Sequence, residues 1–260
     1  MAVATLNEQA VTLRSLHRPG QPLVLANVYD ILSATAVAAL PSCSALATAS
    51  YAVARAAGTE DDDMTLEENL NAARGIGRVA AKHNKPLSVD LQDGYGDKLV
   101  EAVKLVVEAG AVGINLEDCD KDTHKMYPVD VAVKRLQTAL ATAKDLGLPD
   151  FVLNARCDTL IRGGAMDEVI ERGKKYLDAG AATVFVWGGG QRGVSRAEVE
   201  RMVREFQGRL NVSLKWNGGL TVKELAEIGV ARISVGPAIQ LFAMDQYAKR
   251  AEELLKQAEG

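Results

Sequence analysis

Two acidic residues, Asp90 and Glu117, each stand at the end of a short apolar segment, where their carboxylates could share a cation. If both segments are strands of one parallel sheet, the carboxylates leave the sheet at the same edge and repel each other unless a cation lies between them. Such oxygen ligands suit Mg²⁺, which keeps several of its waters, and also Mn²⁺. The pair therefore predicts a magnesium or manganese site. The alternative is that the two acids cap loops or form ion pairs at the rim.

Arg156 also ends an apolar segment. Its planar guanidinium can hold a substrate carboxylate through two parallel hydrogen bonds. The alternative is a structural ion pair with Glu117 or Asp158. Both can hold in one protein, because an arginine paired with protein carboxylates can turn toward a substrate.

The elements that position these residues follow from an alternation of short apolar segments with longer amphipathic ones, as in repeated strand–helix units. Helix-length segments include residues 98–109 and 167–179. The eight predicted strands cover residues 23–28, 43–50, 86–91, 112–118, 151–156, 183–188, 211–217 and 232–236.

Three glycines, Gly110, Gly180 and Gly229, each end a predicted helix and lead directly into a predicted strand, as helix C-caps do. Strand–helix units with short turns predict a parallel sheet, and eight of them close a barrel. The rival, an open doubly wound sheet, calls for a glycine-rich first turn, which residues 28–31 lack. We therefore predict an α/β fold, a (β/α)8 TIM barrel, as a single catalytic domain over residues 1–260.

Active sites of such barrels lie at the carboxyl ends of the strands. Polar residues gather at the predicted carboxyl ends and are scarce at the opposite ends. They include Asn27, Tyr29, Thr48, Ser50, Tyr51, Asp90, Gln92, Asn115, Glu117, Asn154, Arg156, Asp158, Lys215 and Asn217.

Composition narrows the class of protein. The 260 residues are 48% hydrophobic and 25% charged with a net charge of −4, which argues against a nucleic-acid partner. No segment reaches the roughly 20 apolar residues of a membrane span, and the first residues lack the pattern of a secretory signal. The three cysteines form no CxxC pair, so we expect a cytoplasmic protein without disulfides or zinc.

Six segments, in order along nearly the whole chain, resemble motifs of the isocitrate lyase/phosphoenolpyruvate mutase superfamily. They are NVYDILSA (27–34), ATASYAVA (47–54), GTED (58–61), DLQDGYG (90–96), INLED (114–118) and NARCD (154–158).

The resemblance implies a Mg²⁺-dependent enzyme that acts on a small 2-oxo acid through a pyruvate-type enolate. Mg²⁺ and Arg156 would hold the carboxylate and keto oxygen, and the metal would act as a Lewis acid. The implied metal ligands are Asp90, Gln92 and Glu117. The implied substrate contacts, some of them donors to the developing negative charge, are Tyr29, Thr48, Ala49, Ser50, Tyr51, Asn115, Arg156 and Asn217.

Two departures from the superfamily pattern limit what the resemblance implies. Gln92 stands where the D-x-D motif has its second aspartate, so the ion would be held by less negative charge. Residues 119–128, CDKDTHKMYP, replace both the K-K-C-G-H segment of the isocitrate and methylisocitrate lyases and the K-x-N-S segment of the mutases. The chain therefore resembles the branch without the lyase cysteine. His124 is either the acid or base that replaces this cysteine or an exposed loop histidine.

Three functions remain open. The first is a lyase that cleaves a C–C bond of a 2-oxo or 2-hydroxy carboxylic acid. The second is P–C chemistry of the mutase or phosphonopyruvate hydrolase kind, against which the missing K-x-N-S segment counts. The third is a catalytically silent barrel.

Two further segments carry predictions. The acidic loop 60–63 is either a solvated turn or a lid hinged at Gly58, with Asp61 drawn inward only when metal and substrate are bound. The last predicted helix, residues 237–257, has more apolar residues than one barrel helix needs. The resemblance implies exchange of this helix between neighbours, so we expect a homodimer or homotetramer.

Overall fold

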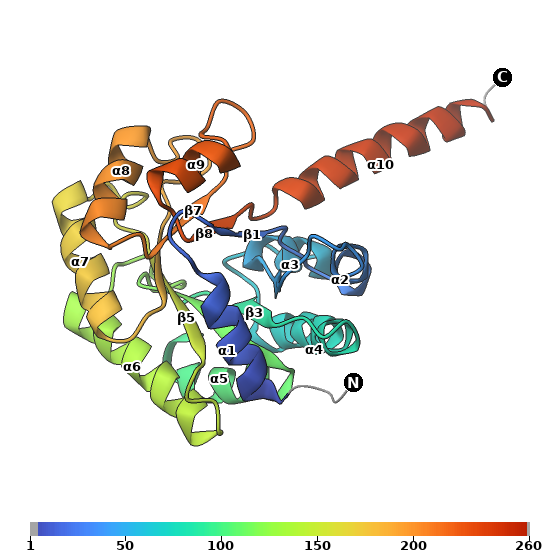
Figure 1. Cartoon of the computed structure of the whole chain (residues 1–260). Helices are drawn as coiled ribbons and strands as arrows, with labels where there is room; N and C mark the ends of the chain where they lie inside the picture. Colours follow the sequence, from blue (N-terminus) through green and yellow to red (C-terminus); the bar gives the residue numbers. More distant parts are fainter. Residues whose placement is uncertain (1–4, 259–260) are drawn as a thin grey trace.

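The structure, a computed structural model, describes residues 5–258 and contains one sheet of eight parallel strands (Figure 1). In the order β1-β8-β7-β6-β5-β4-β3-β2, every strand pairs with its neighbours, and only the junction between β1 and β2 lacks strand pairing. Just beyond their ends Val28 N donates to Ala47 O (2.8 Å) and Val28 bridges Thr48, so the ring closes. The predicted (β/α)8 TIM barrel is confirmed. The strands are β1 (Leu23–Leu25), β2 (Leu46–Ala47), β3 (Leu87–Asp90), β4 (Ala111–Glu117), β5 (Val152–Cys157), β6 (Thr183–Val186), β7 (Leu210–Ser213) and β8 (Arg232–Ser234).

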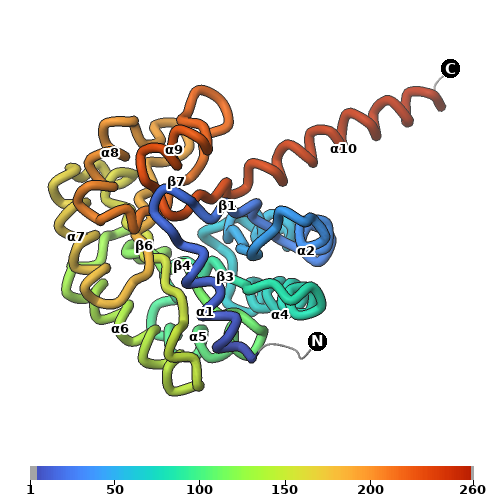
Figure 2. Tube along the Cα trace, viewed as in Figure 1, coloured from blue at the N-terminus to red at the C-terminus, as the bar shows by residue number. Residues whose placement is uncertain are grey.

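Helices surround the sheet, as the tube in Figure 2 also shows. Gly110 (φ 97°) and Gly229 (φ 108°) adopt the left-handed conformation expected at the turns from helix to strand. None of the described helices is long and apolar enough to cross a membrane. The helices are α1 (Leu6–Leu16), α2 (Ile31–Ala38), α3 (Ser50–Ala57), α4 (Leu66–Lys82), the 3-10 helix η1 (Gly96–Lys98), α5 (Leu99–Glu108), α6 (Val129–Asp145), α7 (Met166–Asp178), α8 (Arg196–Glu205), α9 (Val222–Ile228) and α10 (Ala238–Lys256).

Six of the eight predicted strands are longer than the observed ones, and two of these differences affect site residues. The segment 43–50 yields only β2, and Ser50 already begins α3. The segment 211–217 ends as a strand at Ser213, and a turn follows with Gly218 at φ 72°. Each of these two misjudged ends places a predicted site residue on a different element, with consequences given below.

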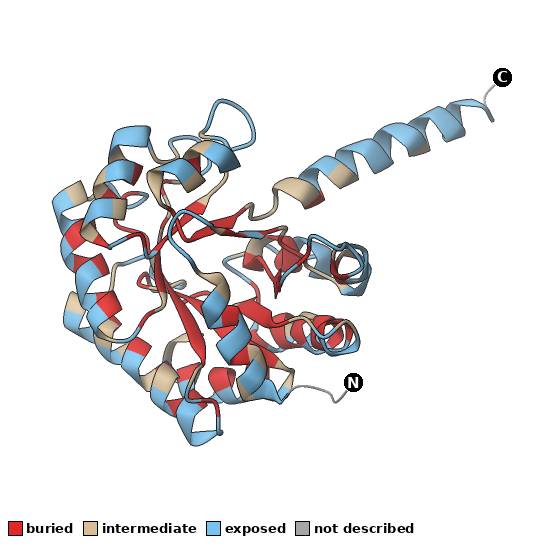
Figure 3. Cartoon of the chain, viewed as in Figure 1, coloured by how far each residue is buried: buried red, intermediate tan, exposed pale blue. Residues whose placement is uncertain are grey.

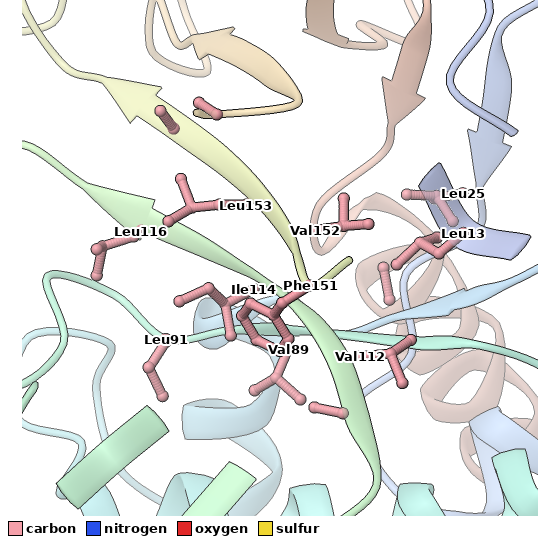
Figure 4. Close-up of a cluster of buried hydrophobic side chains, with 14 of the residues drawn as sticks. Leu13, Leu25, Val89, Leu91, Val112, Ile114, Leu116, Phe151, Val152 and Leu153 are labelled. Atoms are coloured by element: carbon pink, nitrogen blue, oxygen red, sulfur yellow. The ribbon is translucent and has the colours of Figure 1, made fainter. Parts of the chain in front are cut away.

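Helix α1 covers the amino-terminal end of the barrel. Leu13 is fully buried in the same cluster as Leu25 and Val152 (Figure 4). Arg14 Nη2 donates to the carbonyl of Phe151 at the start of β5 (2.9 Å). The carboxyl ends of the strands therefore form the open mouth at the other end.

Buried residues lie along the strands and on parts of the surrounding helices (Figure 3). Val89, Ile114 and Leu153 are fully buried, and each is followed along its strand by a polar residue: Asp90, Asn115 and Asn154. Barrel interiors are normally filled by branched apolar side chains. The polar interior is the first structural sign that this barrel holds a polar ligand. The inward-facing polar residues that are also buried include Ser88, Asn115, Asn154, Thr183, Asn211, Arg232 and Ser234.

Candidate active site

Two adjoining cavities open at the carboxyl end of the barrel. The central cavity, of about 220 Å³, reaches from the mouth into the barrel interior. The outer cavity, of about 300 Å³, lies between the loops that follow β2, β4 and β5. Four residues line both and so form the neck between the cavities: Tyr51, Asp61, Arg156 and Trp187.

Arg156, on β5, is held at this neck by two carboxylates. Its Nη1 donates to Glu117 (2.7 Å), while Nε and Nη2 donate to Asp158 (2.7 and 3.2 Å). Its guanidinium also lies over the ring of Trp187, 4.5 Å from the centroid. Burial alone would lower the pKa of Arg156, but Asp158 and Glu117 raise it, so the side chain stays charged. The structural ion pair is therefore present, in a position from which the guanidinium also faces both cavities.

Asp90 ends β3 beside the first turn of α3. One carboxylate oxygen accepts from Ser50 N (2.9 Å) and the other from Asn115 Nδ2 (2.9 Å). The amino end of a helix favours an anion, which explains why this aspartate is held here. Ser50 is the first residue of α3 and not the end of a strand, so its backbone N–H is free of the helix's own hydrogen bonds and donates to Asp90.

The loop after α3 already lies over the mouth. Gln92 Nε2 donates to Asp61 O (2.6 Å) and Asp61 Oδ1 (3.1 Å), and Lys121 Nζ donates to Asp62 O (2.7 Å). The acidic loop therefore lies inward in this structure, and its movement with metal and substrate stays a prediction. An amide and an ammonium group supply hydrogen bonds that the sequence pattern did not reveal, and the inward-facing carboxylate of Asp61 is protonated more readily than usual.

Several acidic groups in the site have raised pKa values. Burial, and then Asp90, raise the pKa of Asp61 to about 6. Burial is also the main cause that raises the pKa of Glu117, where Arg156 opposes the shift and Asp158 adds to it. Four carboxyl groups, those of Asp61, Asp90, Glu117 and Asp158, lie around the single cation of Arg156, an arrangement that favours a further cation.

The donor set fits a hard divalent cation that keeps several waters. Gln92 Nε2 faces Asp61, so the orientation of the amide is fixed and its Oε1 has no hydrogen-bond partner among the described residues although it is buried. Within residues 5–258 no three His, Cys, Asp or Glu side chains form a metal cluster. Two carboxylates, Asp90 and Glu117, and one amide oxygen are an adequate protein contribution for Mg²⁺, whose remaining ligands are waters or substrate.

The other predicted site residues divide into two groups. Thr48, Ala49, Ser50, Tyr51 and Asn115 line the central cavity. His124 lines the outer cavity, half-exposed, with Nε2 3.9 Å from Asp62 Oδ2. Two residues line neither cavity: Tyr29 packs beside Val53, Ala54 and Met64, and Asn217 is exposed in the loop beyond β7.

Sequence reasoning missed residues on β6, β7 and β8. Strand alternation could have found them, because inward positions on a short strand are two residues apart. On β8 the pattern Arg-Ile-Ser places a charged residue at the start of an otherwise buried strand. The missed residues of the central cavity include Phe185, Trp187, Ser213, Arg232 and Ser234, with Asn211 beside them.

Comparison with known proteins places this geometry among enzymes. The model of the phosphoenolpyruvate phosphomutase family matches residues 13–255. A protein of Mycobacterium tuberculosis is 33% identical over 236 residues, which cover 87% of this chain and 82% of that protein. The 2-methylisocitrate lyase of Escherichia coli K12, a carbon–carbon lyase, is 34% identical over 131 residues, 46% of this chain and 42% of the lyase. A solved structure from Burkholderia cenocepacia, described provisionally as a phosphonomutase, has a TM-score of 0.86 at 35% identity and covers 96% of this chain and 99% of that chain.

Proposed function

The chain belongs to the phosphoenolpyruvate phosphomutase family, which is part of a superfamily of lyases and mutases. We propose that it is a Mg²⁺-dependent lyase. Its substrate is a small 2-oxo or 2-hydroxy carboxylic acid, and a C–C bond breaks to leave a pyruvate-type enolate. The observation that carries the proposal is the position of Arg156 at the neck of two cavities, beside Asp90 and Glu117.

Arg156 binds the substrate carboxylate in this proposal. Its guanidinium already has the fork geometry required, because it pairs with Asp158 through two nitrogens. A substrate carboxylate that enters the central cavity competes with Glu117 for Nη1. Glu117 is then free to serve as a ligand of the cation. When bound, Mg²⁺ acts as a Lewis acid that stabilises negative charge on the substrate oxygens.

Asp61 is the proposed acid–base group. A carboxyl group with a pKa of about 6 exchanges protons readily near neutral pH. Asp61 as base accepts the proton of the substrate hydroxyl as the C–C bond breaks, and as acid it returns a proton to the enolate carbon. Tyr51 lines the same neck, and its hydroxyl can orient the leaving carbonyl. His124 is the alternative base, at the edge of the outer cavity.

The loop that carries Asp61 also excludes water. Its hydrogen bonds to Gln92 and Lys121 keep it over the mouth. A covered site slows protonation of an enolate by solvent. Loop opening is then the step by which substrate enters and product leaves.

The test is turnover of a panel of 2-oxo and 2-hydroxy acids with Mg²⁺, with EDTA, and after Mg²⁺ is restored. We expect a new carbonyl product only when Mg²⁺ is present. Asp61→Asn should lower kcat by about 100-fold or more, the usual contribution of acid–base catalysis. The control Asp63→Asn changes an exposed residue of the same loop that lines neither cavity, and it should keep the activity. If no acid is turned over at any metal concentration, the lyase proposal is contradicted and the catalytically silent barrel is the function that remains.

A second candidate function is P–C bond chemistry. The likeness to the Burkholderia cenocepacia structure favours it. Phosphorus NMR of phosphonopyruvate incubated with the protein and Mg²⁺ separates the two functions, because inorganic phosphate or phosphoenolpyruvate appears only if the P–C bond breaks.

A further inference from the structure

One side of the barrel interior satisfies its own hydrogen bonds. Thr183 Oγ1 donates to Asn154 Oδ1 (2.6 Å), Asn154 Nδ2 to Asn115 Oδ1 (2.8 Å), and Asn115 Nδ2 to Asp90 Oδ1 (2.9 Å). This series of hydrogen bonds runs from β6 across β5 and β4 to β3. Its polar groups need no ligand, and it holds Asp90 in place.

The opposite side, on β7 and β8, is different. Asn211 and Arg232 are paired in register, both line the central cavity, and they are only 1% and 3% exposed. Arg232 Nε and Asn211 Oδ1 are buried without any hydrogen-bond partner among the described residues. A buried donor or acceptor left unpaired costs about 1–3 kcal/mol, so a ligand that pairs with them gains affinity.

Arg232 also forms no ion pair among the described residues, although Asp90, which lines the same cavity, raises its pKa. Its closest polar contacts are long ones to neutral groups, 3.4 Å from Nη1 to His17 Nε2 and 3.4 Å from Nη2 to Ser88 Oγ. Burial lowers the pKa of His17 to about 3, so that imidazole is uncharged. Burial lowers the pKa of Arg232 only to about 10, so the guanidinium remains a cation at neutral pH. No carboxylate among residues 5–258 forms an ion pair with it, and a buried charge without a partner is unfavourable.

The groups next to Arg232 suit an anion. Ser213 and Ser234 line the same part of the central cavity, and their hydroxyls donate to no acceptor in the described part of the chain. A guanidinium with serine hydroxyls beside it is a donor set that matches a carboxylate. The carbonyl oxygen of Asn211 can accept from a hydroxyl carried by the same ligand.

We propose that the inner end of the central cavity is a second carboxylate subsite, built on Arg232 with Ser213 and Ser234. The substrate is then a dicarboxylate that spans the cavity, one carboxylate at Arg156 and the other at Arg232. The assignment of a dicarboxylate as substrate rests on the proposed function. The subsite itself is tested by ligand binding and does not require turnover.

The experiment compares succinate with succinamate, which has the same length but one carboxylate replaced by a neutral amide. Calorimetry with the Mg²⁺-loaded protein measures both dissociation constants. A hydrogen bond to a charged group is worth about 1.5–3 kcal/mol, so we expect succinate to bind about 10- to 100-fold more tightly. Succinate that does not bind at millimolar concentration, or that binds no better than succinamate, would overturn the subsite.

Arg232→Met assigns the effect to this side chain. In this variant the dissociation constants of succinate and succinamate should become about equal, and that of succinamate should stay unchanged. Arg209→Met is the matched control, because Arg209 is exposed just before β7 and the same substitution removes the same charge. It should bind both compounds as the parent does. A preference for succinate that survives Arg232→Met contradicts the proposal.

Two measurements keep the outcome interpretable. Thermal unfolding of Arg232→Met checks the fold, and a purely structural arginine would change the unfolding temperature but not the ratio of the two affinities. If this variant does not fold, Arg232→Lys keeps the charge but removes Nε, and should lower succinate affinity about tenfold. Loss of the succinate preference in a protein that turns over no oxo acid would support the subsite while the proposed lyase function fails.

Discussion

The side-chain amide of Gln92 donates from Nε2 to both the backbone oxygen and the carboxylate of Asp61, at 2.6 and 3.1 Å. An aspartate, which the superfamily motif has at this position, could not donate either bond. The replacement that weakens the charge of the metal site therefore also fastens the acidic loop over it. In the proposed function, metal affinity and loop closure therefore depend on the same residue.

Gln92→Asp should release the acidic loop 60–63 from its position over the mouth of the barrel. The variant places a carboxylate against Asp61, so both hydrogen bonds are lost and the two charges repel. We expect protease cleavage within residues 58–63 to become faster without ligand. Manganese should bind more tightly, because one more negative charge faces the ion. Limited proteolysis and calorimetry measure the two effects.

Gln92→Met is the control for this experiment. It removes the donor without adding charge, so the loop should open while metal affinity does not rise. Manganese affinity that is unchanged or weaker in Gln92→Asp would show that residue 92 does not face the ion.

Asp90 is predicted to be required for metal-dependent activity. Asp90→Asn should abolish turnover and weaken Mn²⁺ binding, while one of its two bonds to Ser50 and Asn115 can persist. Asp90→Ala leaves both donors unpaired, so it should also lower the free energy of unfolding by about 1–3 kcal/mol. Full activity of either variant after exhaustive chelation would contradict the metal site.

The barrel could be predicted from the sequence because its signal is repeated. Eight apolar segments and helix-capping glycines such as Gly110 and Gly229 each report a local requirement of the backbone. Site residues that directly follow predicted strands on β3, β4 and β5, such as Asp90 and Arg156, came together for the same reason.

The remaining site could not be predicted because it depends on where strands end and on contacts between distant segments. Asn217 was assigned to β7, which ends four residues earlier at Ser213. Arg232 contacts groups as distant in the sequence as Ser88, 144 positions earlier, so no local pattern reveals what surrounds it. The bond from Gln92 to Asp61 joins residues 31 positions apart.

Helix α10 predicts self-association. It extends away from the barrel (Figures 1 and 3), and Gln240 is its only buried residue. Beyond its first turns, where Gln240 donates to Ala52 O, the helix is exposed, with Tyr247 at 73% and Leu254 at 67%. An isolated helix of this kind is only marginally stable in water. We expect the helix to pack on a second copy of the chain, as a dimer or tetramer by light scattering at micromolar concentration.

The matched variants test which face carries the association. Phe242→Glu combined with Tyr247→Glu should lower the measured mass, whereas Arg250→Glu, at an exposed charged position of the same helix, should not. A monomeric parent protein would refute the prediction.

The pKa of Asp61 predicts how stability depends on pH. Its carboxyl titrates at about 6 in the fold against an ordinary value of 3.8. Below about pH 4 the group is protonated in both the folded and the unfolded chain. Between pH 4 and 6 the unfolded chain loses this proton first, so the free energy of unfolding falls as pH rises through that window. Because Asp61 is partly accessible to solvent, we expect a loss of about 1–2 kcal/mol, less than the full shift would give.

Asp61→Asn removes this contribution and keeps an oxygen that can accept from Gln92. In urea unfolding with EDTA, the variant should match the parent near pH 4 and exceed its stability by about 1–2 kcal/mol at pH 7.5. Glu117 and Asp118, whose pKa values burial also raises, leave a residual slope in both proteins, so the difference between them is the quantity to compare. Asp63→Asn, the exposed control, should show no such divergence with pH. A difference between Asp61→Asn and the parent that is the same at pH 4 and pH 7.5 would mean that Asp61 is ionised as readily in the fold as in the unfolded chain, and it would remove the main support for Asp61 as the acid–base group.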